Sequence, residues 1–351
     1  MDQLNVAVVG FGPAGAVFHA PLIAAEPRMR VAAIVTGSAE RAAQAQAEHP
    51  DARILPSADD LFGAAGKQID LVVVAAPNDA HAPLARAALA AGKPVVVDKP
   101  VTPTAAEARE LIELADRAGL LLSVFQNRRW DGDFLTVSRL IAAGELGEVT
   151  RFESRFERWR PDLKGGWRET GGPEQAAGLL YDLGSHLVDQ ALTLFGPVAS
   201  VYAQLDARRP GIATDDDAFV ALTHTNGVRS HLWMSAVAAQ LGPRMRVLGS
   251  RGAYVKYGLD VQEDALRDGD RPGEGGTWGA DPEGSWGTCG TELSSRPFKT
   301  ENGAYPAYYA GIAAALLDGA PVPVDPRDAA AALDVLEAAR RSADQNIVVS
   351  L

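Results

Sequence analysis

The stretch Gly10-Phe11-Gly12-Pro13-Ala14-Gly15 constrains the fold of this chain more than any other feature. Its glycines have G-x-G-x-x-G spacing, directly after an apolar segment and before a predicted helix. In that setting the first glycine permits a tight turn, the second lets the backbone approach a pyrophosphate, and the third lets helix and strand pack closely. The N-terminus of the helix then faces the phosphates. A purely structural turn is the alternative, but the position between strand and helix favours a dinucleotide site.

The first 125 residues alternate between apolar strand patterns and helix patterns. This alternation predicts a doubly wound α/β fold with a parallel sheet. The predicted strands are Leu4–Gly10, Met29–Val35, Ile69–Ala76, Pro94–Val97 and Leu120–Phe125, and the predicted helices are Pro13–Ala25, Ala39–Glu48, Ala80–Ala91 and Thr104–Ala118.

After Gln126 the strands come in runs, which predicts a large, mostly antiparallel sheet. Asn226-Gly227 between two runs is a hairpin signal. We therefore expect residues 1–125 to form a Rossmann domain and residues 126–351 to form a second α/β domain. Its predicted strands are Val149–Trp159, Val198–Asp206, Asp216–His224, Gly227–Trp233, Arg244–Gly249 and Ala253–Tyr257, its predicted helices are Asp131–Ala143, Gly178–Phe195, Pro306–Leu317 and Pro326–Ser342, and Asp268–Gly290 is predicted as a long ordered loop.

Composition excludes several classes of function. The 351 residues carry a net charge of −12, which disfavours nucleic-acid and anionic-membrane partners. No apolar run approaches the roughly 20 residues needed to span a bilayer, and the N-terminus lacks the pattern of a signal peptide. The single cysteine, Cys289, permits no intramolecular disulfide and no cysteine zinc site, so we expect a cytoplasmic protein.

The segment after Val35 indicates which dinucleotide is bound. NAD enzymes usually carry an acid at this strand end for the ribose 2′-hydroxyl. Here the chain has Thr36-Gly37-Ser38, followed by Arg41 in the first turn of the next predicted helix. Ser38 and Arg41 suit a 2′-phosphate, which favours NADP over NAD. Glu40 opposes this by repelling phosphate, and a plain helix cap beside a solvated arginine is the other interpretation.

A lysine follows the strand Pro94–Val97 at the sheet edge where ligands bind in doubly wound folds. Lys99, between Asp98 and Pro100, is placed to donate to a substrate oxygen and stabilise an alkoxide. Pro77-Asn78 and His81 follow the preceding strand and face the same edge. A surface ion pair at Asp98-Lys99 and a packing role for His81 are the alternatives.

Asp182 and His186 form a second candidate site, because positions i and i+4 share one helix face. A carboxylate beside an imidazole fixes the ring and raises its basicity, as a general base requires. The helix is strongly apolar elsewhere, so the pair is expected to face a cleft. The same spacing can hold a metal, but no third ligand is suitably spaced, and we expect no metal.

Together these motifs resemble the Gfo/Idh/MocA oxidoreductase family over nearly the whole chain. The resemblance implies a nicotinamide-dependent dehydrogenase that forms a homodimer or homotetramer. It places the substrate in the cleft between the domains, lined by the region Trp159–Arg168 and Tyr181. Within the family the chain is most similar to the NADP-dependent scyllo-inositol dehydrogenase-like branch, so a cyclic polyol or sugar is the implied substrate. The stretches that carry the resemblance are Gly10–Gly15, Val72–His81, Asp98–Pro100, Asn127–Phe134, Arg151–Trp159 and Tyr181–Gln190.

The resemblance also assigns residues. Lys99, Asp182 and His186 are the implied catalytic set. Many family members have glutamate where this chain has Asp98, and the shorter acid keeps the charge. The implied cofactor-binding residues are Gly10, Phe11, Gly12, Gly15, Thr36, Ser38, Arg41, Pro77, Asn78, His81, Asp98, Lys99, Asn127 and Arg128, and the implied substrate-binding residues are Lys99, Arg129, Trp159, Arg168, Tyr181, Asp182 and His186. A glycoside hydrolase that uses tightly held NAD and a non-enzymatic dinucleotide sensor are the alternatives among relatives.

Overall fold

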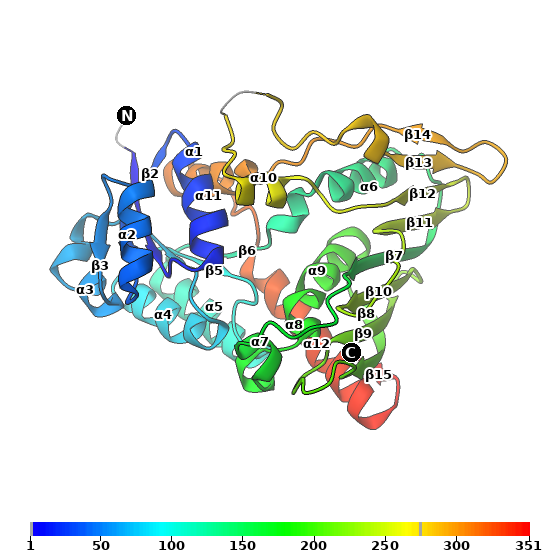
Figure 1. Cartoon of the computed structure of the whole chain (residues 1–351), viewed down its shortest axis with the longest axis horizontal. Helices are drawn as coiled ribbons and strands as arrows, with labels where there is room; N and C mark the ends of the chain where they lie inside the picture. The colour runs from blue at the N-terminus through cyan, green and yellow to red at the C-terminus, as the bar shows by residue number, and fades with distance from the viewer. Residues whose placement is uncertain (1–2, 274–275) are drawn as a thin grey trace. The chain divides into compact units, whose positions relative to one another are not determined.

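The computed structural model describes residues 3–273 and 276–351, and the chain forms two compact units (Figure 1). The first unit comprises Met1–Asn127, Gln262–Trp278 and Ala304–Ala330. The second unit comprises Arg128–Val261, Gly279–Gly303 and Ala331–Leu351. The last helix, α12 (Pro326–Gln345), is divided between them after Ala330.

The first unit contains a six-stranded sheet in which all neighbours are parallel, in the order β3-β2-β1-β4-β5-β6. This is the strand order of a doubly wound dinucleotide-binding fold, as the sequence predicts. Val72, Val73 and Val96 are fully buried because helices cover both faces of such a sheet. The strands are β1 (Leu4–Val9), β2 (Met29–Val35), β3 (Arg53–Leu55), β4 (Leu71–Val74), β5 (Val95–Asp98) and β6 (Leu122–Phe125).

Local capping residues set the ends of several helices in this unit. The Ser38 side chain accepts a hydrogen bond from the backbone N–H of Arg41, and Thr104 accepts one from Glu107. The predicted helix after the glycine turn begins with a π-helical segment, η1 (Ala14–His19), before α1 (Ala20–Ala25). The other helical segments are α2 (Ala39–Glu48), α3 (Ala58–Phe62), η2 (Ala64–Gln68), α4 (Asn78–Ala90), α5 (Ala105–Ala118), α10 (Gln262–Asp268) and α11 (Pro306–Asp318).

The second unit contains a nine-stranded sheet in the order β14-β13-β12-β11-β7-β10-β9-β8-β15. Every neighbouring pair is antiparallel except β7 with β10, which confirms a mostly antiparallel sheet. The strands are β7 (Val149–Glu157), β8 (Val198–Asp206), β9 (Asp217–His224), β10 (Arg229–Ser235), β11 (Met245–Gly249), β12 (Ala253–Lys256), β13 (Gly287–Gly290), β14 (Arg296–Phe298) and β15 (Val349–Ser350).

Alternation along the central strands gives this sheet two different faces. In β9 every second residue is buried, and α8 and α9 pack against β10 and its neighbours. Phe219, His231 and Trp233 have the opposite register and form an aromatic cluster, with Phe219 and Trp233 ring centres 5.1 Å apart. The helical segments of this unit are α6 (Gly132–Ala142), α7 (Trp167–Thr170), η4 (Pro173–Gln175), α8 (Leu179–Asp182), α9 (Gly184–Phe195) and η5 (Glu283–Ser285), and η3 (Asn127–Trp130) spans the boundary between the units.

Several sequence predictions differ from the structure in detail. The single helix predicted over Gly178–Phe195 is two helices, separated at Leu183. The predicted loop Asp268–Gly290 ends in strand β13, because Gly287–Gly290 pairs with both β12 and β14. The strand predicted to Trp159 ends at Glu157. In the part of the chain that the structure describes, no helix is long and apolar enough to cross a membrane.

Candidate active site

The glycine turn follows β1, the central strand of the parallel sheet, and each glycine meets a distinct requirement. Gly10 has a φ of +100°, and a Cβ there would lie 2.5 Å from the carbonyl oxygen of Ala75. A Cβ on Gly15 would lie 2.1 Å from the carbonyl oxygen of Gly10. A Cβ on Gly12 would meet only the guanidinium of Arg41, at 3.7 Å from Nη1. The turn is thus closed by tight packing at its ends and open at its middle, as a backbone cradle for a pyrophosphate requires.

The remaining predicted cofactor residues of the first unit follow the carboxyl ends of adjacent parallel strands. Ser38 and Arg41 follow β2, Pro77 and Asn78 follow β4, and Asn127 follows β6. Because parallel strands end at one sheet edge, the fold brings these residues to the edge that carries the glycine turn. No acidic residue occupies the positions directly after β2, where Thr36, Gly37 and Ser38 lie.

Asp98 lies at the end of β5 and organises the turn that carries Lys99. Its Oδ1 accepts a hydrogen bond of 2.8 Å from the backbone N–H of Lys99 and lies 3.9 Å from Nε2 of His19. The His19 Nδ1 atom lies 2.6 Å from the hydroxyl of the buried Tyr309. Burial alone would raise the pKa of the Asp98 carboxyl, but His19, Lys99 and His81 together lower it. A fixed negative charge therefore lies directly before Lys99.

His81 supports the same turn from inside. It is buried, with Nδ1 2.8 Å from the carbonyl oxygen of Pro100 and Nε2 2.8 Å from that of Ala76. Burial lowers its pKa, against the opposing effects of Asp98 and the two carbonyls. These contacts join the end of β4 to the Lys99 turn. Both ring nitrogens of His81 therefore face backbone carbonyl oxygens.

In the second unit, Asp182 and His186 lie on either side of the break between α8 and α9. The Asp182 side chain is partly exposed, with Oδ1 3.6 Å from Nε of Arg168. His186 is buried, and its ring centre lies 6.2 Å from that of Phe156. Leu183 lies between the two helices with backbone angles in the helical region.

Asp215 holds α8 in place, a role that the sequence did not predict. Its Oδ2 accepts a hydrogen bond of 2.7 Å from the backbone N–H of Leu180, and its Oδ1 lies 3.7 Å from Nη2 of Arg340. Gly178 makes this approach possible, since a Cβ there would lie 2.2 Å from Oδ1 of Asp215. Burial raises the pKa of Asp215 despite the hydrogen bond from Leu180 and the charge of Arg340. Asp215 is thereby a positioning residue for the helix that ends at Asp182.

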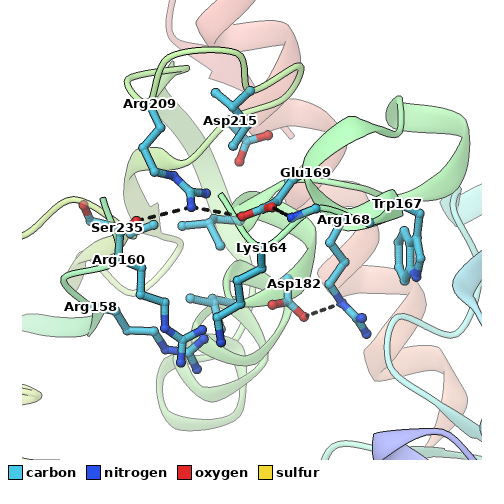
Figure 2. A pocket seen from close by; sticks show the side chains of 17 residues that line it. Arg158, Arg160, Lys164, Trp167, Arg168, Glu169, Asp182, Arg209, Asp215 and Ser235 are labelled. Atoms are coloured by element: carbon cyan, nitrogen blue, oxygen red, sulfur yellow. Dashed lines mark hydrogen bonds and ion pairs between the residues drawn. The ribbon is translucent and has the colours of Figure 1, made fainter. Parts of the chain in front are cut away.

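A pocket with a cavity volume of about 260 Å³ opens in the second unit and includes Asp182 (Figure 2). Arg168, a predicted substrate residue, also lines it. Arg160 and Lys164, from the region 159–168 that the resemblance implies as cleft lining, line it too. The charged lining residues that the sequence did not indicate are Arg158, Glu169, Arg209 and Asp215.

Other residues predicted to bind substrate lie in different surroundings. Tyr181 is buried, and the guanidinium of Arg340 lies 5.3 Å from its ring centre. Burial raises the pKa of its hydroxyl. The guanidinium of Arg129 donates two hydrogen bonds to Asp189, at 2.8 and 2.6 Å. Neither Tyr181 nor Arg129 lines the pocket that holds Asp182.

Arg128 belongs to a buried charged cluster in the second unit. Its Nη1 lies 3.5 Å from Oδ2 of Asp131, and Arg244 lies 3.3 Å from Asp133. Both guanidinium groups lie over the ring of Phe156, at 4.9 and 4.3 Å from its centre. Burial raises the pKa of Asp131 well above its ordinary value, despite the nearby Arg128. Asp131 and Asp133 flank Gly132, the first residue of α6.

A doubly wound sheet with this glycine turn and a lysine at its carboxyl edge defines a dinucleotide-binding oxidoreductase fold. Residues 4–126 match the family model described as "Oxidoreductase family, NAD-binding Rossmann fold", and residues 138–351 match the companion "C-terminal alpha/beta domain". The chain belongs to the Gfo/Idh/MocA oxidoreductase family.

Relatives match over the full length. The chain is 44% identical over 353 residues to the uncharacterized oxidoreductase YdgJ of Escherichia coli, covering 100% of this chain and 99% of the relative. It is 35% identical over 355 residues to the scyllo-inositol 2-dehydrogenase (NADP(+)) IolW of Bacillus subtilis, covering 100% and 97%. A solved oxidoreductase from Bacillus cereus superposes with a TM-score of 0.87 at 28% identity, covering 99% of each chain.

Proposed function

We propose that this chain transfers a hydride between NADP(H) and a secondary hydroxyl or ketone carbon of a cyclic polyol or sugar. The observation that carries the proposal is the open glycine turn with Arg41 over its middle glycine, in a chain similar along its whole length to an NADP-dependent inositol dehydrogenase. Bound NADP would supply the hydride acceptor. The residues of this chain supply binding, orientation and proton transfer.

The preference for NADP rests on the segment after β2. A 2′-phosphate needs cationic donors, and Arg41 lies at the first turn of α2 with Ser38 as the cap. The N-terminus of α2 adds a favourable dipole. The other proposed cofactor contacts are those on the carboxyl edge of the first unit's sheet, with Asn127 and Arg128 in addition.

The proposed chemistry assigns one role to each member of the catalytic set. Lys99 stabilises the oxyanion that develops as the hydroxyl loses its proton. His186 accepts that proton, and Asp182 orients the imidazole or relays the proton. The pH profiles of the Lys99 and His186 variants decide which of these two residues is the formal base. The proposed substrate contacts are Lys99, Arg129, Trp159, Arg168, Tyr181, Asp182 and His186.

Residues 1–125 and 126–351 would act as cofactor and substrate domains, in a cytoplasmic homodimer or homotetramer. The aromatic cluster of Phe219, His231 and Trp233 supports an assembly, because an apolar cluster on an open sheet face favours cover by another copy. Sedimentation velocity measures the oligomeric state. A monomer at micromolar concentration would contradict this part of the proposal.

Steady-state kinetics tests the function. The purified chain is assayed for oxidation of NADPH and NADH with scyllo-inosose and a panel of ketoses, and for the reverse reaction with the matching polyols. We expect turnover with NADPH and at least one cyclic ketone. Tight retention of NAD without net reduction of any ketone, together with glycoside cleavage, would contradict it.

A further inference from the structure

The pocket that contains Asp182 is cationic, although the chain as a whole carries a net charge of −12. Its lining includes five basic side chains and three acidic ones. This excess is a local feature of the pocket, and a local excess of positive charge raises the concentration of anions. The basic residues are Arg158, Arg160, Lys164, Arg168 and Arg209, and the acidic residues are Glu169, Asp182 and Asp215.

The extended backbone after β7 directs the side chains of Arg158 and Arg160 into the pocket. The chain continues in extended form past β7. The backbone N–H of Arg158 donates a 2.8 Å hydrogen bond to the carbonyl oxygen of Ser235, the last residue of β10, and that of Arg160 donates one of 2.8 Å to Ala236. Alternate residues of an extended chain point to opposite sides. Arg158 and Arg160 therefore line the pocket, and Trp159 between them is 57% exposed and does not.

Each acid of the pocket already has a basic partner. Glu169 lies 3.0 Å from Nη1 of Arg209, and Asp182 lies 3.6 Å from Nε of Arg168. Asp215 faces Arg340, which is not part of the lining. All three acids of the lining therefore form ion pairs with basic residues other than Arg160 and Lys164.

Within the described part of the chain, no ion pair compensates the charges of Arg160 and Lys164. Figure 2 shows the charged ends of Arg158, Arg160 and Lys164 gathered at one place, beside the pair of Asp182 and Arg168. A guanidinium and an ammonium converging on one point are the donors that carboxylate and phosphate oxygens require.

We propose that Arg158, Arg160 and Lys164 form an anion subsite, and that the substrate of this enzyme is a polyol or keto sugar carrying a carboxylate or phosphate. The inference rests on the proposed function, because it places the anionic group on the same substrate that Asp182 contacts. The cavity of about 260 Å³ lies just below the usual range for small-molecule sites, so it suits a monosaccharide-sized ligand.

A charge-matched pair of double variants tests the subsite. Arg160→Gln with Lys164→Gln removes two pocket charges, and Arg296→Gln with Lys299→Gln removes two exposed charges outside the pocket. NADPH oxidation is measured with D-fructose, D-fructose 6-phosphate and 5-keto-D-gluconate. We expect kcat/KM of the unaltered chain to favour at least one anionic ketone over D-fructose by about tenfold or more, since each charge-assisted bond contributes about that factor.

In the pocket double variant, the ratio of kcat/KM for the anionic ketone to that for D-fructose is expected to fall close to one. The fall comes from a higher KM for the anionic ketone, while kcat/KM for D-fructose stays unchanged. The control double variant is expected to keep the preference. Phosphorylated and carboxylated ketones are separate arms, so the result also says which anion is recognised. Equal kcat/KM for charged and neutral ketones, or a preference that survives in the pocket double variant, would overturn the subsite.

Equilibrium binding separates this proposal from the proposed function. Titration calorimetry compares D-glucitol 6-phosphate and D-gluconate with neutral D-glucitol, without any turnover. If no ketone is reduced by NADPH but an anionic polyol binds in a manner that depends on Arg160 and Lys164, the subsite stands and the proposed hydride transfer fails. If ketones are reduced and no anion binds more tightly than D-glucitol, the subsite fails alone.

Discussion

The guanidinium of Arg41 lies over Gly12, so that a Cβ on this glycine would be 3.7 Å from Nη1 of the arginine. The side chain therefore reaches from α2 to the middle of the turn that would hold a pyrophosphate. Its proposed role is to bind a 2′-phosphate, which NADP carries and NAD lacks.

Arg41→Gln is expected to raise KM for NADPH by about 10- to 100-fold and to leave KM for NADH nearly unchanged, because it removes about 1.5–3 kcal/mol of charge-assisted hydrogen bonding. Parallel steady-state measurements with both cofactors check this. Arg53→Gln is the control, since Arg53 is exposed at the beginning of β3, on the opposite edge of the sheet. An equal loss with NADPH and NADH would show that Arg41 does not read the 2′ position.

Gly178→Ala is expected to destabilise the fold around Asp182. At a φ of +91° a non-glycine residue costs about 1–2 kcal/mol, and here its Cβ would also displace Asp215 from the start of α8. Gly258→Ala is the control. Gly258 has a similar positive φ of +75°, but a Cβ there would meet nothing within 4 Å, so this variant measures the cost of the backbone conformation alone. Thermal unfolding should therefore show a clearly larger fall in Tm for Gly178→Ala. Equal falls would mean that the approach of Asp215 is unimportant.

Lys99 and His186 are expected to act on one bound substrate. Lys99→Ala and His186→Asn should each lower kcat by about 10²-fold or more, and the double variant should lose far less than the product of the two effects. Dinucleotide affinity of the His186→Asn variant, measured by fluorescence titration, should stay within a fewfold of the unaltered chain. His231→Asn combined with Lys99→Ala is the matched control, for which the effects should multiply. If the kcat loss of the Lys99→Ala, His186→Asn double variant equals the product of the two single losses, the two residues do not act together on one substrate.

The raised pKa of Asp131 gives a stability effect with a definite sign. Its folded-state pKa lies above the unfolded value of about 3.9, so the folded protein binds the proton more tightly. This contribution to stability is present below about pH 4 and is lost as pH rises through the raised folded-state pKa. Asp131→Asn removes this titration. The Tm of the variant minus the Tm of the unaltered chain should therefore rise as pH increases from about 4 through the raised pKa of Asp131. A difference in Tm that is constant with pH would contradict the assigned shift.

Residues close in sequence account for the parts of the fold and site that could be predicted. Gly10, Gly12 and Gly15 signal the turn by spacing, and the valine-rich strands signal a sheet covered on both faces. Strand β3 escapes notice because its three residues include an exposed arginine. The break at Leu183 is hidden because the apolar period continues through it.

Only part of the pocket could be predicted, the region 159–168 and Asp182, because the rest of its lining comes from residues far apart in the chain. Asp215 supports α8 across 35 positions of sequence, and Arg209 meets Glu169 across 40. Arg158 and Arg160 have the alternation of an ordinary strand, so nothing local distinguishes them from solvent-facing residues. Only the pairing of the extended segment beyond β7 with Ser235 and Ala236, at the end of β10, turns both side chains into the pocket.

Direct observation of hydride transfer tests the central claim most plainly. NADPH carrying deuterium at C4 of the nicotinamide is incubated with the chain and the ketone that gives the highest kcat/KM, and the product is analysed by mass spectrometry and NMR. The account predicts one deuterium on the new carbinol carbon, transferred from one face of the nicotinamide. A product without deuterium, or no reduction of any cyclic or open-chain ketone by either cofactor, would contradict it.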